Sequence, residues 1–209
     1  MDYGCGGLAM TQAQPKPLTF AQYLAQDKGT DRRYELTHGV LIDVPPESDD
    51  NISLALGLAE YLKQVVSWRL LRTHATTLQV PSLPGVPQEN RFPDLMVLTP
   101  ELAAQLKGKS SAITFAMPNP ALVVEVVSPY RSSAEDNYRR DYIDKRQQYE
   151  QRGIAEYWIV DPTSAQVTVL VLAPVGYQTQ VFKGKAQITS SAFPTLSLSV
   201  DQLFALGHE

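Results

Sequence analysis

A glutamate stands alone in an otherwise apolar segment of the chain. Glu125 is the one polar residue before the closing serine of PALVVEVVS at 120–128, and the composition of this segment predicts a strand buried on both faces. An ionised carboxylate in such a strand needs a compensating charge, because removing it from water costs several kcal/mol even after relaxation. A metal ion or a lysine could supply that charge. The sequence offers a second acid, Asp94, ahead of another apolar segment, and a lysine, Lys145, within an aromatic helical stripe.

These three residues are of the types that metal-assisted phosphodiester hydrolysis requires. Two carboxylates on neighbouring strands can share Mg²⁺ or Mn²⁺, hard cations that prefer oxygen ligands and leave water positions open for a substrate phosphate. A lysine beside them can orient or deprotonate the attacking water and neutralise charge that develops on the phosphate. Each residue also has a structural interpretation, since Pro93-Asp94 is a common strand-entry pair and a lone lysine often rests its stem on aromatic rings. Together, Asp94, Glu125 and Lys145 favour the catalytic interpretation.

The aromatic stripe belongs to a helix that the sequence predicts over residues 135–152. Successive helical residues advance by about 100°, so Tyr138, Tyr142 and Tyr149 share a sector of about 60° with Lys145. Asp141 lies one turn before the lysine, near the same edge. Tyr149, one of the three tyrosines, either touches the site or belongs to the core.

The rest of the chain predicts further strands and helices. The segments expected to be extended are a hairpin of 33–36 and 40–44, then 76–80, 92–98, 120–128, 155–160, 167–172 and 177–182. The expected short helices lie near 20–24, 100–108 and 201–206. A long helix begins at Asp49 or Asp50. It is predicted to bury a face made of Ile52, Leu56, Ala59, Leu62, Val66 and Leu70.

Length and composition describe an ordinary globular chain. With 209 residues, 44% of them hydrophobic, the chain can build one substantial core, and we expect a single domain over 18–209 after a loose tail over 1–17. No segment approaches the roughly 20 apolar residues of a membrane span. A net charge of −4 argues against a protein that coats nucleic acid by charge alone. The single cysteine, Cys5, and the lack of a secretory signal pattern favour a cytoplasmic protein.

Other familiar site patterns do not occur in the sequence. The three histidines, His38, His74 and His208, have no spacing typical of a zinc site, and we expect each to be structural or exposed. There is no P-loop, GxGxxG or GxSxG motif, so nucleotide-cofactor and serine-hydrolase functions lack support.

Several segments together resemble a known family, Uma2, which is widespread in cyanobacteria and belongs to the restriction-endonuclease-like PD-(D/E)XK superfamily. The similarity runs from the segment at Tyr34 to Asp161. The residues that carry it are FPD at 92–94, LVVEVVSP at 122–129, DYIDK at 141–145 with Tyr149, and GIAEYWIVD at 153–161.

The resemblance implies an α/β (α+β) fold, in which a mixed central β-sheet is flanked by helices within a single domain. It also implies that Asp94 and Glu125 bind Mg²⁺ or Mn²⁺. In the superfamily pattern the lysine stands two residues after the second acid, a position that Val127 fills here. The resemblance therefore implies that the lysine has moved to the following helix, in agreement with Lys145.

Further residues are candidates for the same site. The resemblance suggests an additional acid at Glu35, which could equally be an exposed hairpin residue. Ser128 either caps its loop or hydrogen-bonds to Glu125, and Asp141 accompanies the lysine. Relatives often have a histidine near the start of the long helix, where this chain has Asn51.

The preferred hypothesis is a magnesium-dependent endonuclease that hydrolyses nucleic acid, with DNA as the expected substrate. A homodimer with paired active sites would suit double-strand cutting. The alternative is a catalytically inactive module on the same fold that binds nucleic acid or another protein. Glycoside hydrolysis by Asp94 and Glu125 ranks lower, because it gives Lys145 no role.

Overall fold

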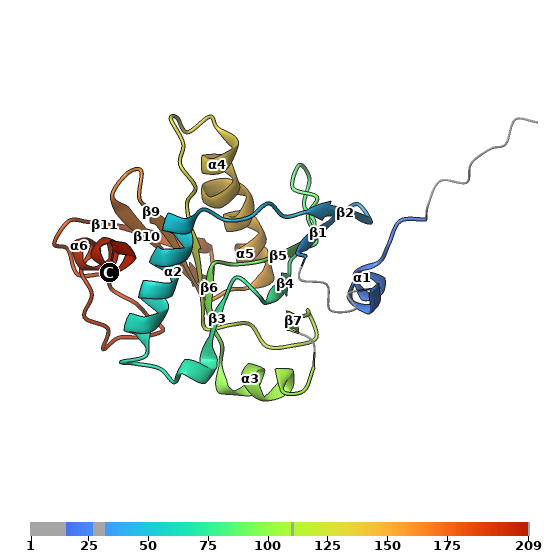
Figure 1. The fold of residues 1–209 in the computed structure, drawn as a ribbon, viewed down its shortest axis with the longest axis horizontal. Coiled ribbons are helices and arrows are strands. Elements are labelled where there is room, and N and C mark those ends of the chain that lie inside the picture. The colour runs from blue at the N-terminus through green and yellow to red at the C-terminus, as the bar shows by residue number, and fades with distance from the viewer. Residues whose placement is uncertain (1–15, 27–31, 110, 209) are drawn as a thin grey trace, which may run out of the picture.

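The computed structural model describes residues 16–26, 32–109 and 111–208, which are built around a six-stranded sheet (Figure 1). Most of the expected tail over 1–17 lies outside the described residues. The strands follow the order β11-β10-β9-β8-β6-β3. Their bounds are β3 Leu71–Thr73, β6 Leu95–Val97, β8 Leu122–Val126, β9 Glu156–Asp161, β10 Gln166–Ala173 and β11 Gly176–Lys183.

The sheet is mixed, and its two central strands are buried on both faces. β8 and β9 pair in parallel, whereas the other neighbours pair antiparallel. Every residue of β8 and β9 is buried, which is typical of parallel strands covered on both sides. Consecutive parallel strands need a crossover connection, and the helical segment between them provides it. The predicted strand-helix-strand unit is confirmed.

Helices cover both faces of this sheet (Figure 1). The helices of the described residues are α1 Phe20–Gln26, α2 Asp49–Leu62, α3 Pro100–Leu106, α4 Asp136–Arg139, α5 Arg146–Arg152 and α6 Val200–Ala205. Of these, α1 lies apart from the six-stranded sheet and packs against Leu36 (Figure 1). α2 and α6 share a core with Val124 and Val126 of β8, whereas α3 and α5 share the opposite core with Val123. Because successive strand residues point to opposite faces, Glu125 points to the α5 side with Val123. None of the helices in the described part of the chain is long and apolar enough to cross a membrane.

Smaller elements form a wall beside the central sheet. A hairpin and a three-stranded sheet of order β5-β4-β7 make up this wall. Leu36 of the hairpin donates its N–H to the Asn90 side chain of that sheet at 2.7 Å, which ties the two together. The bounds of these strands are β1 Tyr34–Thr37, β2 Val40–Asp43, β4 Thr77–Gln79, β5 Asn90–Arg91 and β7 Ala112–Ile113. Two 3₁₀ turns lie elsewhere in the fold, η1 Trp68–Leu70 before β3 and η3 Leu206–His208 after α6.

The buried face predicted for the long helix is confirmed at Ala59 and Leu62 and wrong at Leu56 and beyond the end of the helix. Leu56 is 50% exposed, and the helix ends at Leu62 rather than continuing to Leu70. Apolar residues lie on almost every side of this helix, so three- and four-residue spacing fits more than one face. The residues that follow leave the helix because β3 pairs with β6. The side chains that α2 buries are Asn51, Leu54, Ala55, Leu58, Ala59 and Leu62.

The helix predicted over 135–152 is interrupted at its centre. Between α4 and α5 lies a π-helical turn, η2, over Arg140–Lys145. Single π-turns inside helices are frequent at functional sites. This one carries both Asp141 and Lys145. The helix then ends, as predicted, at Gly153, whose φ of +83° is readily adopted by glycine.

Candidate active site

Glu125 is held from two sides by the interrupted helix. It is completely buried, and Lys145 Nζ lies 2.8 Å from its Oε2. Tyr149, itself buried in the core, donates its hydroxyl to Oε1 at 2.5 Å. Burial raises the pKa of Glu125 to about 7, although the charge of Lys145 opposes that rise. At neutral pH the Glu125 carboxyl group is therefore only partly ionised, because the charge of Lys145 does not fully offset the effect of burial.

Lys145 lies between two buried carboxylates. Its Nζ is 2.7 Å from Oδ1 of Asp141 and 2.8 Å from Oε2 of Glu125. Burial acts to lower the pKa of Lys145, but Asp141 and Glu125 outweigh burial and raise it, so the lysine carries its charge. Its side chain is only 11% exposed, so the ammonium does not extend into bulk water as the structural interpretation required.

The π-turn is anchored to the sheet beneath it. Tyr157 of β9 donates its hydroxyl to the main-chain oxygen of Asp141 at 3.0 Å. Arg140, at the start of the turn, donates from Nη2 to Oγ of Ser128 at 3.0 Å and lies 3.5 Å from Oδ2 of Asp141. These contacts fix the backbone that presents Asp141 and Lys145.

Asp94 lies directly before β6 and completes the pair of acids. β6 runs antiparallel to β8, and continuing their register by one residue places Asp94 opposite Glu125. Oδ2 of Asp94 accepts the N–H of Val126 at 2.6 Å. Both interpretations of Asp94 therefore hold. Its hydrogen bond with Val126 fixes it at the entry to β6, and the pairing of β6 with β8 places it beside Glu125.

His74, expected to be structural or exposed, contacts this acid. Its Nδ1 lies 3.3 Å from Oδ1 of Asp94, and its φ of +47° is unusual for a residue other than glycine. Backbone held in such a conformation clusters at functional sites. No sequence pattern indicates this contact, because His74 and Asp94 meet only through the pairing of β3 with β6.

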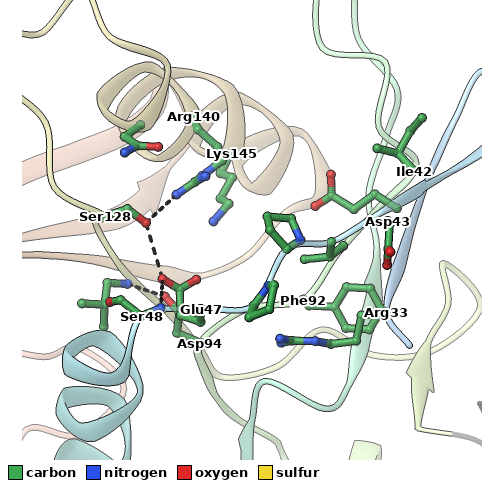
Figure 2. Close-up of a pocket in the computed structure, with 16 residues that line it drawn as sticks. Arg33, Ile42, Asp43, Glu47, Ser48, Phe92, Asp94, Ser128, Arg140 and Lys145 are labelled. Atoms are coloured by element: carbon green, nitrogen blue, oxygen red, sulfur yellow. Dashed lines mark hydrogen bonds between the residues drawn. The ribbon is translucent and has the colours of Figure 1, made fainter. Parts of the chain in front are cut away.

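A cavity of about 430 Å³ opens beside the acids (Figure 2). Asp94, Arg140 and Lys145 line it, together with the β1–β2 hairpin and the segment that leads from the hairpin to α2. Figure 2 shows Arg33 and Asp43 on the side away from Arg140 and Lys145. One side of the cavity therefore has an acidic and a basic group, and the opposite side has two basic groups.

Glu47 is an acid of this cavity that sequence reasoning missed. Its Oε1 accepts a hydrogen bond from Asn51 at 2.7 Å and lies 3.4 Å from Oγ of Ser128. The available signal was its position after two prolines and before Ser48, which caps α2 through a hydrogen bond to the N–H of Asn51. Asn51 thus holds Glu47 at the cavity. Of the two alternatives for Ser128, the hydrogen bond to Glu125 is absent from the described contacts, and Ser128 bridges Glu47 and Arg140.

Glu35 lies on the cavity wall but already has a cationic partner. Nη1 of Arg91 lies 3.1 Å from Oε2 of Glu35. Arg91 is 2% exposed and also donates from Nε to Gln148 at 2.8 Å. This ion pair ties the hairpin to α5, so Glu35 shapes the wall of the cavity and is not an unpaired acid facing it.

The charges of the site favour a bound cation. When Glu125 is ionised, four carboxylates of this network face two cationic side chains, Lys145 and Arg140, which leaves two negative charges. No cluster of three or more metal-ligating side chains forms within the described ranges, so two carboxylates are the most that an ion would find preassembled. Such a set suits Mg²⁺, which keeps several water ligands. The four carboxylates belong to Glu47, Asp94, Glu125 and Asp141.

A mixed sheet between helices, with one acid directly before β6, a second acid within the neighbouring β8 and a lysine that meets the second acid, is typical of the restriction-endonuclease-like class. The chain belongs to the Uma2 family, described as "Putative restriction endonuclease", which matches residues 20–201. The resemblance seen in the sequence is thereby confirmed.

A solved structure shows the same fold. It is described as "a putative nuclease belonging to DUF820 from Anabaena variabilis ATCC 29413" and was determined at 1.96 Å resolution. It matches with a TM-score of 0.67 and 19% sequence identity, over 91% of this chain and 99% of that chain. Comparison with curated proteins finds no match. The mixed α+β fold expected from the sequence is confirmed.

Proposed function

We propose that this protein is a Mg²⁺- or Mn²⁺-dependent nuclease that hydrolyses phosphodiester bonds of DNA. The observation that carries the proposal is the position of Lys145, whose ammonium lies between Asp141 and Glu125 while its side chain lines the cavity. A buried ion network of this kind stabilises a fold less than apolar packing of the same volume would. Its place at a cavity wall therefore favours a chemical role. Membership of the Uma2 family supports the same activity.

Asp94 and Glu125 would hold the cation through their carboxylate oxygens. When bound, the cation supplies Lewis acidity toward a phosphate oxygen and lowers the pKa of a bound water. Tyr149 fixes one oxygen of Glu125, which leaves the other, Oε2, facing Lys145. If the cation replaces Lys145 at that oxygen, the ammonium still has Asp141 as a partner. Lys145 then remains at the cavity wall, where it can orient the attacking water.

Arg140 is the group placed to neutralise a substrate phosphate. It lines the cavity, and hydrogen bonding to Ser128 holds its guanidinium in position. Burial acts to lower the pKa of Arg140, but nearby acids, with Asp141 first, raise it, so the charge is permanent. A fixed cation of this kind stabilises charge that develops on a phosphate during reaction.

The test is cleavage of supercoiled plasmid, single-stranded DNA and RNA by the purified chain with Mg²⁺, Mn²⁺ or a chelator. We expect cleavage of DNA that depends on the cation. Asp94→Asn and Lys145→Met should each reduce the rate by about 10²–10³-fold, the scale for removing one group that stabilises the transition state. Lys63→Met, at a lysine of 46% side-chain exposure just after α2, is the matched control and should leave the rate unchanged.

The alternative is a catalytically inactive module that binds nucleic acid or another protein. One observation favours it, namely that both oxygens of Glu125 already have protein partners. In that case the folded wild-type chain would cleave no substrate with either cation, and any DNA binding would be the same for wild type and Asp94→Asn. Gel-shift assays beside the cleavage assays separate the two functions.

A further inference from the structure

The two edges of the central sheet are built differently (Figure 1). β3, at one edge, is three residues long, and its Arg72 donates to the main-chain oxygens of Arg69 and Leu71. β11, at the other edge, is eight residues long. Natural edge strands are usually short or carry charges, proline or a bulge, which discourage pairing with another chain. Residues 177–182 of β11 have none of these features, and their register with β10 is unbroken.

The register determines which backbone groups of β11 point away from the sheet. β10 and β11 are joined by a two-residue turn, so Ala173 and Gly176 form a hydrogen-bonded pair and such pairs recur at every second position. Thr179 and Val181 therefore direct their N–H and C=O groups outward. Tyr177 agrees with this alternation, because its N–H donates to the side chain of Glu150 at 3.1 Å. No hydrogen bond from the described residues reaches the outward groups of Thr179 and Val181.

We propose that β11 pairs antiparallel with β11 of a second copy of this chain and so joins the two six-stranded sheets. With the two-fold axis at Gln180, Thr179 of each copy faces Val181 of the other. Both residues have outward N–H and C=O groups, so each such pair exchanges two backbone hydrogen bonds. Val181 is 54% exposed in the single chain, and it packs beside the Thr179 methyl group of the second copy.

Charge complementarity identifies the occupant as a second copy. The same register places Lys183 opposite Tyr177 of the second copy, next to Glu150, the acid that accepts the Tyr177 N–H. Lys183 and Tyr177 lie on the same face of the strand, since their positions differ by an even number. Neither Lys183 nor Glu150 forms a salt bridge within the described chain. Pairing brings them together twice by symmetry, one ion pair at each end of the joined strands.

Sedimentation velocity of the full chain over a wide range of concentration tests the proposal without reference to nuclease activity. We expect a species of twice the 23.1 kDa chain mass. Val181→Lys places a charge at the centre of the paired edge and should raise the dimer dissociation constant at least tenfold. Val40→Lys, at a valine of β2 that is 57% exposed against 54% for Val181, is the matched control and should leave it unchanged.

A charge exchange provides a second test that does not depend on tolerance of Val181→Lys. Lys183→Glu should weaken the dimer, and combining it with Glu150→Lys should restore it, a recovery that loss of folding cannot produce. The proposal is overturned by a chain that stays monomeric at every concentration. It is equally overturned by a dimer that Val181→Lys and Val40→Lys affect alike, or by a monomer whose Thr179 and Val181 amides resist hydrogen exchange, which would show that the chain covers its own edge.

Discussion

Replacing Glu125 by glutamine is expected to change how the stability of the protein depends on pH. Burial raises the pKa of Glu125 to about 7 in the folded protein, from an ordinary value of 4.5. Between these pH values the folded state binds a proton that the unfolded chain has already lost. The contribution of this group to the free energy of unfolding is therefore largest at acid pH, falls as the pH rises toward 7, and is constant above it. Glutamine does not titrate, so Glu125→Gln lacks this decline.

The size of the effect follows from the difference in pKa. At about 1.4 kcal/mol per pKa unit, the folded and unfolded values differ by about 3 kcal/mol in free energy. Urea denaturation of wild type and Glu125→Gln, from a pH below 4.5 to slightly alkaline pH, measures it. The stability of the wild type relative to the variant should fall by that amount over the range. Glu60→Gln, at a glutamate whose side chain is 72% exposed, controls for the loss of one carboxylate.

The result that refutes this reasoning is a constant difference between wild type and Glu125→Gln at every pH. It would mean that Lys145 compensates the burial of Glu125 completely, so that the acid is ionised throughout. A difference that grows in favour of the wild type as the pH rises would contradict it more strongly, because the folded state would then prefer the charged form.

Three further perturbations test the site. Lys145→Met should lower the free energy of unfolding by about 3–5 kcal/mol, because two buried carboxylates lose their cation; urea denaturation measures this, and a loss no greater than that of Lys63→Met contradicts it. Mn²⁺ at about 100 times its dissociation constant should stabilise the wild type by about 2.7 kcal/mol but not Asp94→Asn, and equal shifts of the two unfolding curves would exclude Asp94 as a ligand. His74→Asn keeps a side-chain donor and tolerates positive φ, whereas His74→Gly keeps only the backbone conformation. Calorimetry should find Mn²⁺ binding about 10–100-fold weaker in the glycine variant alone, and equal affinities would show that the contact of His74 with Asp94 does not matter.

Local patterns predicted most of the elements but not the interruption of the helix that carries Lys145. The helices α3 and α6, the β1–β2 hairpin and the buried strands β8 and β9 follow from neighbouring residues alone. The π-turn does not, because helical periodicity is nearly the same on either side of it. Its anchor is the hydroxyl of Tyr157, which comes from β9 across the sheet. Nothing near Asp141 in sequence indicates that contact.

The sequence by itself identified three groups of the candidate site, Asp94, Glu125 and Lys145. An acid within an apolar strand, an acid before another strand and a lysine on an aromatic helical face are properties of composition and spacing, and each was recognisable in isolation. Their residue types also favour one class of chemistry, because carboxylates and a lysine suit a hard cation and a phosphate.

Only the tertiary structure decided how those groups are paired. The antiparallel register of β6 and β8 placed Asp94 opposite Glu125, and the crossover from β8 to β9 brought Lys145 and Tyr149 onto the same carboxylate. Glu47 joined the site through its position before the Ser48 cap of α2, and His74 joined it through the pairing of β3 with β6. The physical reason is that ion pairing and pKa depend on distances of a few ångströms between segments far apart in the chain, which strand register and helix packing set and local sequence does not.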